Sequence, residues 1–112
     1  MGIIIRLLVV VAAALISSYI LPGVQISGFT SALMLAIVLA ILNAIVRPIL
    51  VLLTIPITIL TLGLFLLVIN ALIILLADSL VPGFNVDGFF WALIFSFVLA
   101  IVTSILDAIF DR

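Results

Sequence analysis

The chain has 112 residues, of which 71% are hydrophobic and 6% charged, whereas a soluble domain is about half apolar and a quarter charged. Three Arg and four Asp cannot cover a water-facing surface, so the composition excludes a soluble globular protein and predicts an integral membrane protein. The net charge of −1 argues against nucleic-acid binding, and the absence of Cys, His, Glu and Lys leads us to predict no enzyme, cofactor or metal site.

The first residues carry no targeting signal by pattern. Met1 and Gly2 begin like a myristoylation motif, but Arg6 stands where that motif has Ser or Thr. A single Arg after three Ile is also a poor start for a cleaved signal peptide. We therefore expect the first apolar segment to be a membrane span.

Polar and helix-breaking residues divide the chain into four apolar segments, at 3–21, 29–47, 63–81 and 89–107. Each has about 19 residues and would reach about 28 Å as a helix, close to the hydrocarbon thickness of a bilayer. Helices satisfy their own backbone groups in lipid, and the long Ile, Leu and Val runs do not alternate as barrel strands do. The sequence predicts an all-α integral membrane protein with four transmembrane helices.

Two related loops join the first segment to the second and the third to the fourth. Pro and Gly would end each outgoing helix, and Ser27 or Asp87 is placed to N-cap the next helix. The residues between alternate, which is typical of short extended segments, and we predict that the two segments pair as a two-stranded ribbon. The repeated loop positions are Pro22, Gly23 and Gly28, and Pro82, Gly83, Asp87 and Gly88.

Shifted by 60 residues, positions 22–45 match positions 82–105 at 11 of 24 sites. We interpret this match as the duplication of a helical hairpin within one membrane domain. Because a hairpin has an even number of spans, both copies would share one orientation, related by a pseudo-twofold axis along the membrane normal. The expected limits are 1–52 for repeat 1, 53–60 for the connector and 61–112 for repeat 2.

The positive charges predict the orientation. If the chain starts inside, Arg6, Arg47 and Arg112 all lie on that side, and the two hairpin loops carry no positive charge. By the positive-inside rule, both termini are expected in the cytoplasm and both hairpin loops in the periplasm.

Residues 48–62 form an apolar stretch of about 15 residues, which is short for a span. We predict an interfacial or re-entrant segment broken at Pro56, in which Thr54, Thr58 and Thr61 bond to backbone carbonyls. The alternative is a crossing, which would invert the second hairpin.

Small residues recur every four positions on the second and fourth predicted spans. Such small-residue ladders allow close approach of helix backbones in lipid, so we predict a helix-packing face, either within the chain or between chains. The ladders comprise Ala32, Ala36, Ala40 and Ala44, and Ala92, Ser96, Ala100 and Ser104.

A few polar residues lie within or beside the spans. Asn43 and Asn70 are expected to bond to a neighbouring helix, or to line a polar path or contact a headgroup. Arg47 and Asp107 occupy equivalent repeat positions, where they either form a salt bridge or extend separately to water.

Several motifs together resemble the bacterial four-span membrane proteins of phage holin family 4, the mycobacterial-type holin superfamily. The resemblance covers nearly the whole chain and implies a small protein of the bacterial inner membrane; the holin name implies oligomeric membrane lesions. It rests on Leu21-Pro22-Gly23 and on the stretches 42–48, 60–65, 69–71 and 82–89.

The expected function is that of a small non-enzymatic, holin-like membrane protein that self-associates and affects membrane permeability. The alternative is an accessory subunit or envelope-stress protein that acts through a partner protein or lipid, since no span shows the continuous polar stripe that a wide pore needs. The expected partners are membrane lipid, further copies of the chain or another membrane protein, and not nucleic acid.

Overall fold

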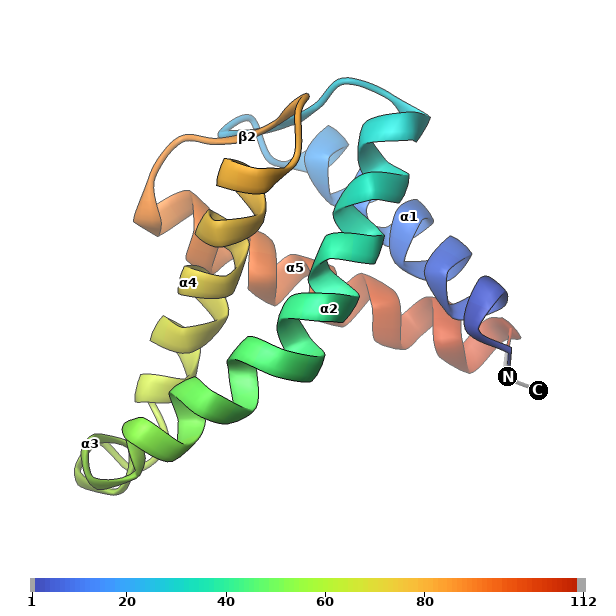
Figure 1. Ribbon diagram of the computed structural model, residues 1–112. Coiled ribbons are helices and arrows are strands. Elements are labelled where there is room, and N and C mark those ends of the chain that lie inside the picture. The colour runs from blue at the N-terminus through green and yellow to red at the C-terminus, as the bar shows by residue number, and fades with distance from the viewer. Residues whose placement is uncertain (1, 111–112) are drawn as a thin grey trace.

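The computed structural model describes residues 2–110, which form four long helices, one short helix and two short strands (Figure 1). Helices α1, α2 and α5 are each long and apolar enough to cross a bilayer, and α4 is a shorter apolar helix. The predicted all-helical membrane class is therefore confirmed and is consistent with four spans. The elements are α1 (Ile3–Ile20), β1 (Val24–Ile26), α2 (Phe29–Leu53), α3 (Ile55–Leu60), α4 (Phe65–Leu80), β2 (Phe84–Val86) and α5 (Phe89–Phe110).

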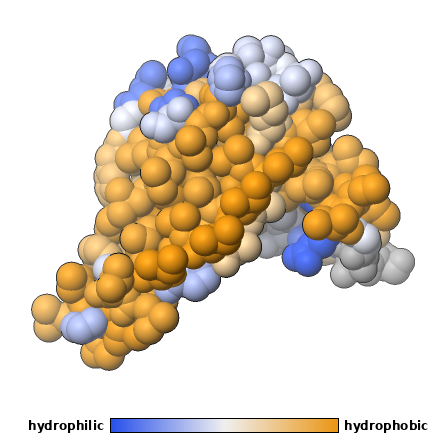
Figure 2. Space-filling model, viewed as in Figure 1, coloured by the Kyte–Doolittle hydropathy of each residue, from blue (hydrophilic) through white to orange (hydrophobic). Residues whose placement is uncertain are grey.

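Strands β1 and β2 form the expected two-stranded ribbon, and their pairing is antiparallel, with Gln25 opposite Asn85. The N–H of Ser27 donates to the carbonyl of Gly83 at 2.8 Å, and the N–H of Asp87 donates to the carbonyl of Gly23 at 2.9 Å. The two donors are 60 positions apart in the sequence, and so are the two acceptors. Each loop therefore donates the same bond to the other loop. The ribbon connects the ends of all four long helices, and hydrophilic residues gather at this end of the molecule (Figures 1 and 2).

The expected N-cap at Ser27 is wrong. Gly28 is the N-cap residue of α2, and no side chain caps that helix. The Ser27 hydroxyl lies instead 2.9 Å from that of Ser31, which donates to the Pro82 carbonyl at 3.0 Å. Both serines are therefore used to hold the first loop against the second.

Helices α1 and α4 each pack against both α2 and α5. Consequently α2 and α5 lie diagonally across the bundle. Away from the ribbon the helices diverge, because α2 and α4 lead to α3 on one side while α1 and α5 run to the other (Figure 1).

The same positions are buried in α1 and α4 after a shift of 60 residues. Inward-facing residues of α1 are Val9, Val11, Ala13, Ala14 and Ser17, and those of α4 are Ile69, Ala71, Ile73, Ile74 and Ala77. In the half of the bundle next to the ribbon, Leu35, Phe84 and Phe95 are fully buried, and the rings of the two phenylalanines lie 5.5 Å apart. This half of the interior is therefore filled.

The connector differs from the expected one. Helix α2 continues through Pro48 to Leu53, and membrane helices tolerate an internal proline more readily than helices in water. The helix ends at Thr54, and Pro56 stands in the first turn of α3, where a missing N–H costs nothing. The break between the two helices therefore lies at Thr54, two residues before the predicted position, and the interfacial or re-entrant placement of this segment stays a prediction.

The threonines of the connector behave in two ways. The hydroxyls of Thr54 and Thr61 donate to the carbonyls of Leu50 and Ile57 at 2.7 and 3.0 Å, as predicted. The hydroxyl of Thr58 is buried without a hydrogen-bond partner among the described residues.

Candidate functional site

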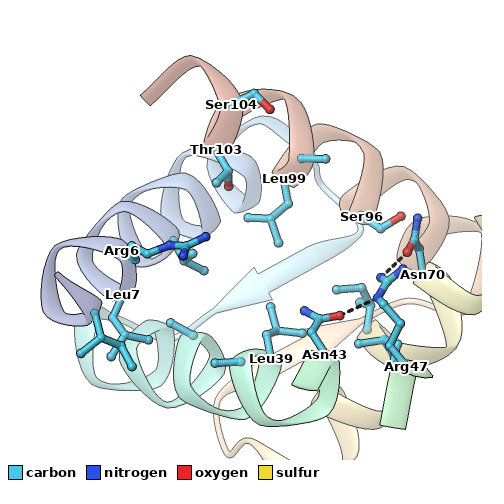
Figure 3. A pocket seen from close by; sticks show the side chains of 17 residues that line it. Arg6, Leu7, Leu39, Asn43, Arg47, Asn70, Ser96, Leu99, Thr103 and Ser104 are labelled. Atoms are coloured by element: carbon cyan, nitrogen blue, oxygen red, sulfur yellow. Dashed lines mark hydrogen bonds between the residues drawn. The ribbon is translucent and has the colours of Figure 1, made fainter. Parts of the chain in front are cut away.

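A cavity of about 590 Å³ lies among the four long helices, in the half of the bundle away from the ribbon. Its walls come from residues 3–10 of α1, 36–47 of α2, 70–74 of α4 and 96–104 of α5. The helices diverge in this half, so their side chains leave the space between them open (Figure 3). Most of the wall is apolar, with Leu7, Val10, Leu39, Ile73, Ile74 and Leu99.

The cavity does not continue to the ribbon. Its lining on α5 begins at Ser96, directly after Phe95, and its lining on α2 begins at Ala36, directly after Leu35. Both preceding side chains are fully buried in the filled half of the bundle. The cavity therefore ends inside the protein.

Arg47 connects two helices on one wall of the cavity. Its Nε donates to Oδ1 of Asn43, one turn earlier on α2, at 2.9 Å, and its Nη2 donates to Oδ1 of Asn70 on α4 (Figure 3). The two asparagines singled out in the sequence are thus joined through one guanidinium group. Because both partners are neutral amides, they orient Arg47 without cancelling its charge.

Arg6 of α1 lies across the cavity from this cluster, with its guanidinium group directed into the open space (Figure 3). Among residues 2–110 neither Arg6 nor Arg47 forms a salt bridge, and no acidic residue lines the cavity. The site therefore combines two uncompensated positive charges with apolar walls. The sequence pattern does not indicate that Arg6 faces a cavity.

The expected pair of Arg47 with Asp107 is not formed within the described part of the chain. Asp107 is on α5, which lies diagonal to α2, whereas Asn70 is on α4, which packs directly against α2. Arg47 therefore bonds to Asn70 because α4 is the neighbour of α2 and α5 is not.

The small-residue ladders do not pack against each other within the chain. Ala32 and Ala36 are buried with Val11, and Ala92 is buried in the main core. Ala36, Ala40, Ser96, Ala100 and Ser104 face the cavity from its two sides, while Ala44 is exposed and outside the lining. The small side chains thus leave space between diagonal helices, and packing between chains stays a prediction.

The repeated loop residues lie at the ribbon, away from the cavity. Gly23 and Gly83 are in close contact with the opposite half of the molecule: a Cβ at Gly23 would overlap the ring of Trp91, and one at Gly83 would overlap the hydroxyls of Ser27 and Ser31. These positions serve the structure of the ribbon. Within the described residues there is no group of His, Cys, Asp or Glu that could hold a metal ion.

Comparison with known proteins places this architecture in a family. The model described as "Mycobacterial 4 TMS phage holin, superfamily IV" matches residues 1–105. The chain belongs to this family. The resemblance predicted from the sequence motifs is therefore confirmed.

Two bacterial proteins are similar to this chain over most of its length. It is 37% identical over 87 residues to the uncharacterized membrane protein YvlD of Bacillus subtilis, covering 77% of this chain and 72% of the relative. It is 42% identical over 80 residues to an uncharacterized protein of Streptomyces coelicolor, covering 68% of this chain and 64% of the relative. No solved structure matches the chain.

Proposed function

We propose that the chain is a non-enzymatic protein of the bacterial inner membrane that holds a membrane lipid in its cavity, and that a single chain forms no passage across the bilayer. One observation carries this proposal: the cavity is wide and mostly apolar in one half of the bundle but ends against the packed side chains of Leu35 and Phe95. A cavity that is closed at one end suits the binding of an amphiphile better than the flow of water or ions. The relative from Bacillus subtilis is described as a membrane protein, which supports the membrane location.

The cavity is proposed to open toward the cytoplasm. Arg6 and Arg47 both lie in the half of the bundle opposite the ribbon, and the positive-inside rule places such charges on the cytoplasmic side. The ribbon, with exposed Gln25 and Asn85, would then face the periplasm. In this arrangement α3 lies at the cytoplasmic surface of the membrane.

The proposal includes the origin of the fold by duplication of a hairpin. The reciprocal bonds of the ribbon and the shared buried positions of α1 and α4 support a pseudo-twofold relation between residues 1–52 and 61–112. The connector 53–60 between the two proposed repeats contains the short helix α3.

Self-association with an effect on permeability is the second candidate. The description of the family as phage holins favours it. The exposed position of Ala44 on α2 leaves one member of the small-residue ladder available to another copy. In this case the passage would lie between chains and not through the cavity.

The two candidates predict different behaviour in liposomes that contain a trapped dye. We expect the purified chain to retain about one phospholipid per copy after mild detergent extraction, and the liposomes to stay tight. Ala40→Phe fills the cavity and should reduce the retained lipid several-fold, since Ala40 lines it. Native mass spectrometry measures the retained lipid, and dye release measures the leak.

Ala44→Phe is the matched control, because Ala44 lies one turn further along α2 and outside the lining. It should retain as much lipid as the wild-type chain. Loss of lipid from both variants, or no retained lipid in the wild type, would overturn the proposal. Dye release that rises with the amount of protein and falls in Ala44→Phe would support the second candidate instead.

A further inference from the structure

We infer that the cavity selects a phospholipid with a net negative headgroup, whose phosphate binds Arg47 while Arg6 supplies a second positive charge from the opposite wall. The inference rests on the proposed function, since it names the class of lipid that the cavity holds. It depends on the donors of Arg47, the charge balance of the cavity and the chemistry of its walls.

Arg47 is oriented for an anion. A guanidinium group has five N–H donors in a planar fork, and two of them are used by Asn43 and Asn70. The others have no hydrogen-bond partner within residues 2–110. Such a fork can bind two oxygens of a phosphate at once, and the charge on both partners makes these hydrogen bonds stronger than neutral ones.

The charge balance favours an anionic headgroup over a zwitterionic one. Among residues 2–110, two arginines and no carboxylate line the cavity. A positive charge near the hydrocarbon region is costly unless it is paired or reaches water. A lipid with a choline or ethanolamine group would bring a further cation into a site where the described part of the chain places no acidic side chain to receive it.

The walls distinguish a lipid from free phosphate. Beyond the polar cluster the cavity is bordered by Leu39, Ile73 and Leu99, which would contact acyl chain and give inorganic phosphate nothing to bind. An ion without an apolar part would leave most of the cavity unfilled. We therefore assign the anion to a lipid.

Three polar residues of the cavity differ in charge or polarity from their equivalents in the repeat, whereas Asn43 has the polar equivalent Thr103. The equivalents of Arg6 and Asn70 at a distance of 60 residues are Leu66 and Val10, and the equivalent of Arg47 is Asp107. The shared buried positions of α1 and α4 include none of these polar residues. The fold that the two halves share thus does not require Arg6, Arg47 or Asn70. This independence from the fold is expected of residues that bind a ligand.

The test is a competition between phosphatidylglycerol and phosphatidylcholine for the full chain in mild detergent, read by native mass spectrometry. We expect the wild-type chain to prefer phosphatidylglycerol by about tenfold, as charged pairs in partly desolvated sites commonly give. Arg47→Gln should bring this preference close to one. Arg47→Lys keeps the charge but loses the planar fork, so it should retain only part of the preference.

Arg6→Gln gives a second readout that does not depend on the Arg47 network. Arg6 is exposed and its side chain has no hydrogen bond within the described chain, so its replacement should leave the helical content unchanged. It should lower the preference several-fold. Asp107→Asn is the control, because it changes the charge by one unit on α5 outside the cavity lining and should have no effect.

The outcomes separate this inference from the proposed function. If both lipids bind equally and neither arginine variant changes the ratio, the cavity holds lipid but the inference is overturned. If no lipid of either kind binds, the proposed function itself fails. If millimolar inorganic phosphate displaces phosphatidylglycerol completely, the site takes free phosphate and the assignment to a lipid is wrong.

Discussion

Replacing Phe95 by alanine is expected to destabilise the bundle by about 3–5 kcal/mol, the usual cost of deleting a buried phenylalanine side chain. Phe95 is 0% exposed, and its ring centroid lies 5.5 Å from that of Phe84 on the ribbon. In lipid the loss of packing contacts is the main penalty, because packing holds membrane helices together. The loss can be measured as a shift in the denaturant midpoint of the detergent-solubilised protein, followed by helical circular dichroism.

Phe97 provides the matched control on the same helix. Its side chain is 60% exposed on the surface of the bundle, so Phe97→Ala should destabilise the protein much less than Phe95→Ala. Equal stability of Phe95→Ala and Phe97→Ala would show that the half of the bundle next to the ribbon is not closed. That result would remove the main support for a cavity with a single opening.

Replacing Gly83 by alanine is expected to have the second large effect, because two costs add at this residue. Its φ of +84° is unfavourable for any residue with a Cβ, which costs about 1–3 kcal/mol. The new Cβ would also overlap the hydroxyls of Ser27 and Ser31, and such overpacking costs about 1–3 kcal/mol more. The ribbon should separate, which exposes the amides of the two strands to hydrogen exchange.

Gly88→Ala is the control that measures the cost of the positive φ alone, without steric overlap. Gly88 also has a positive φ, of +110°, but a Cβ there would meet no atom within 4 Å. We expect Gly88→Ala to destabilise the protein less than Gly83→Ala in the same unfolding measurement. If the two variants are equally stable, the contact of Gly83 with the first loop does not contribute to stability.

Features that depend on local sequence could be predicted. The four apolar segments follow from composition, and the ribbon follows from alternating residues between Pro-Gly and Gly. The end of α2 could not be predicted in the same way, since Pro48 is a helix breaker in water but stays within this helix. Its tolerance depends on the surrounding structure, which the chain pattern does not reveal.

The site could be predicted only in part, because it depends on which helices are neighbours. The bond between Asn43 and Arg47 joins residues four apart on one helix, which is a spacing visible in the sequence. The second partner, Asn70, depends on the packing of α4 against α2. If the two small-residue ladders packed within one chain, α2 was expected to contact α5. Because α2 and α5 lie diagonally in the bundle, the ladders instead face each other across the cavity.

The side from which introduced cysteines react tests the central claim most directly, since the chain has no cysteine of its own. Ser96→Cys and Ser104→Cys place a thiol on the cavity wall, and Asn85→Cys places one on the exposed side of the ribbon. With a membrane-impermeant thiol reagent, we predict that both cavity thiols react only from the cytoplasmic side and the ribbon thiol only from the periplasmic side. Reaction of Ser96→Cys from the periplasmic side would contradict a cavity closed by the ribbon half of the bundle.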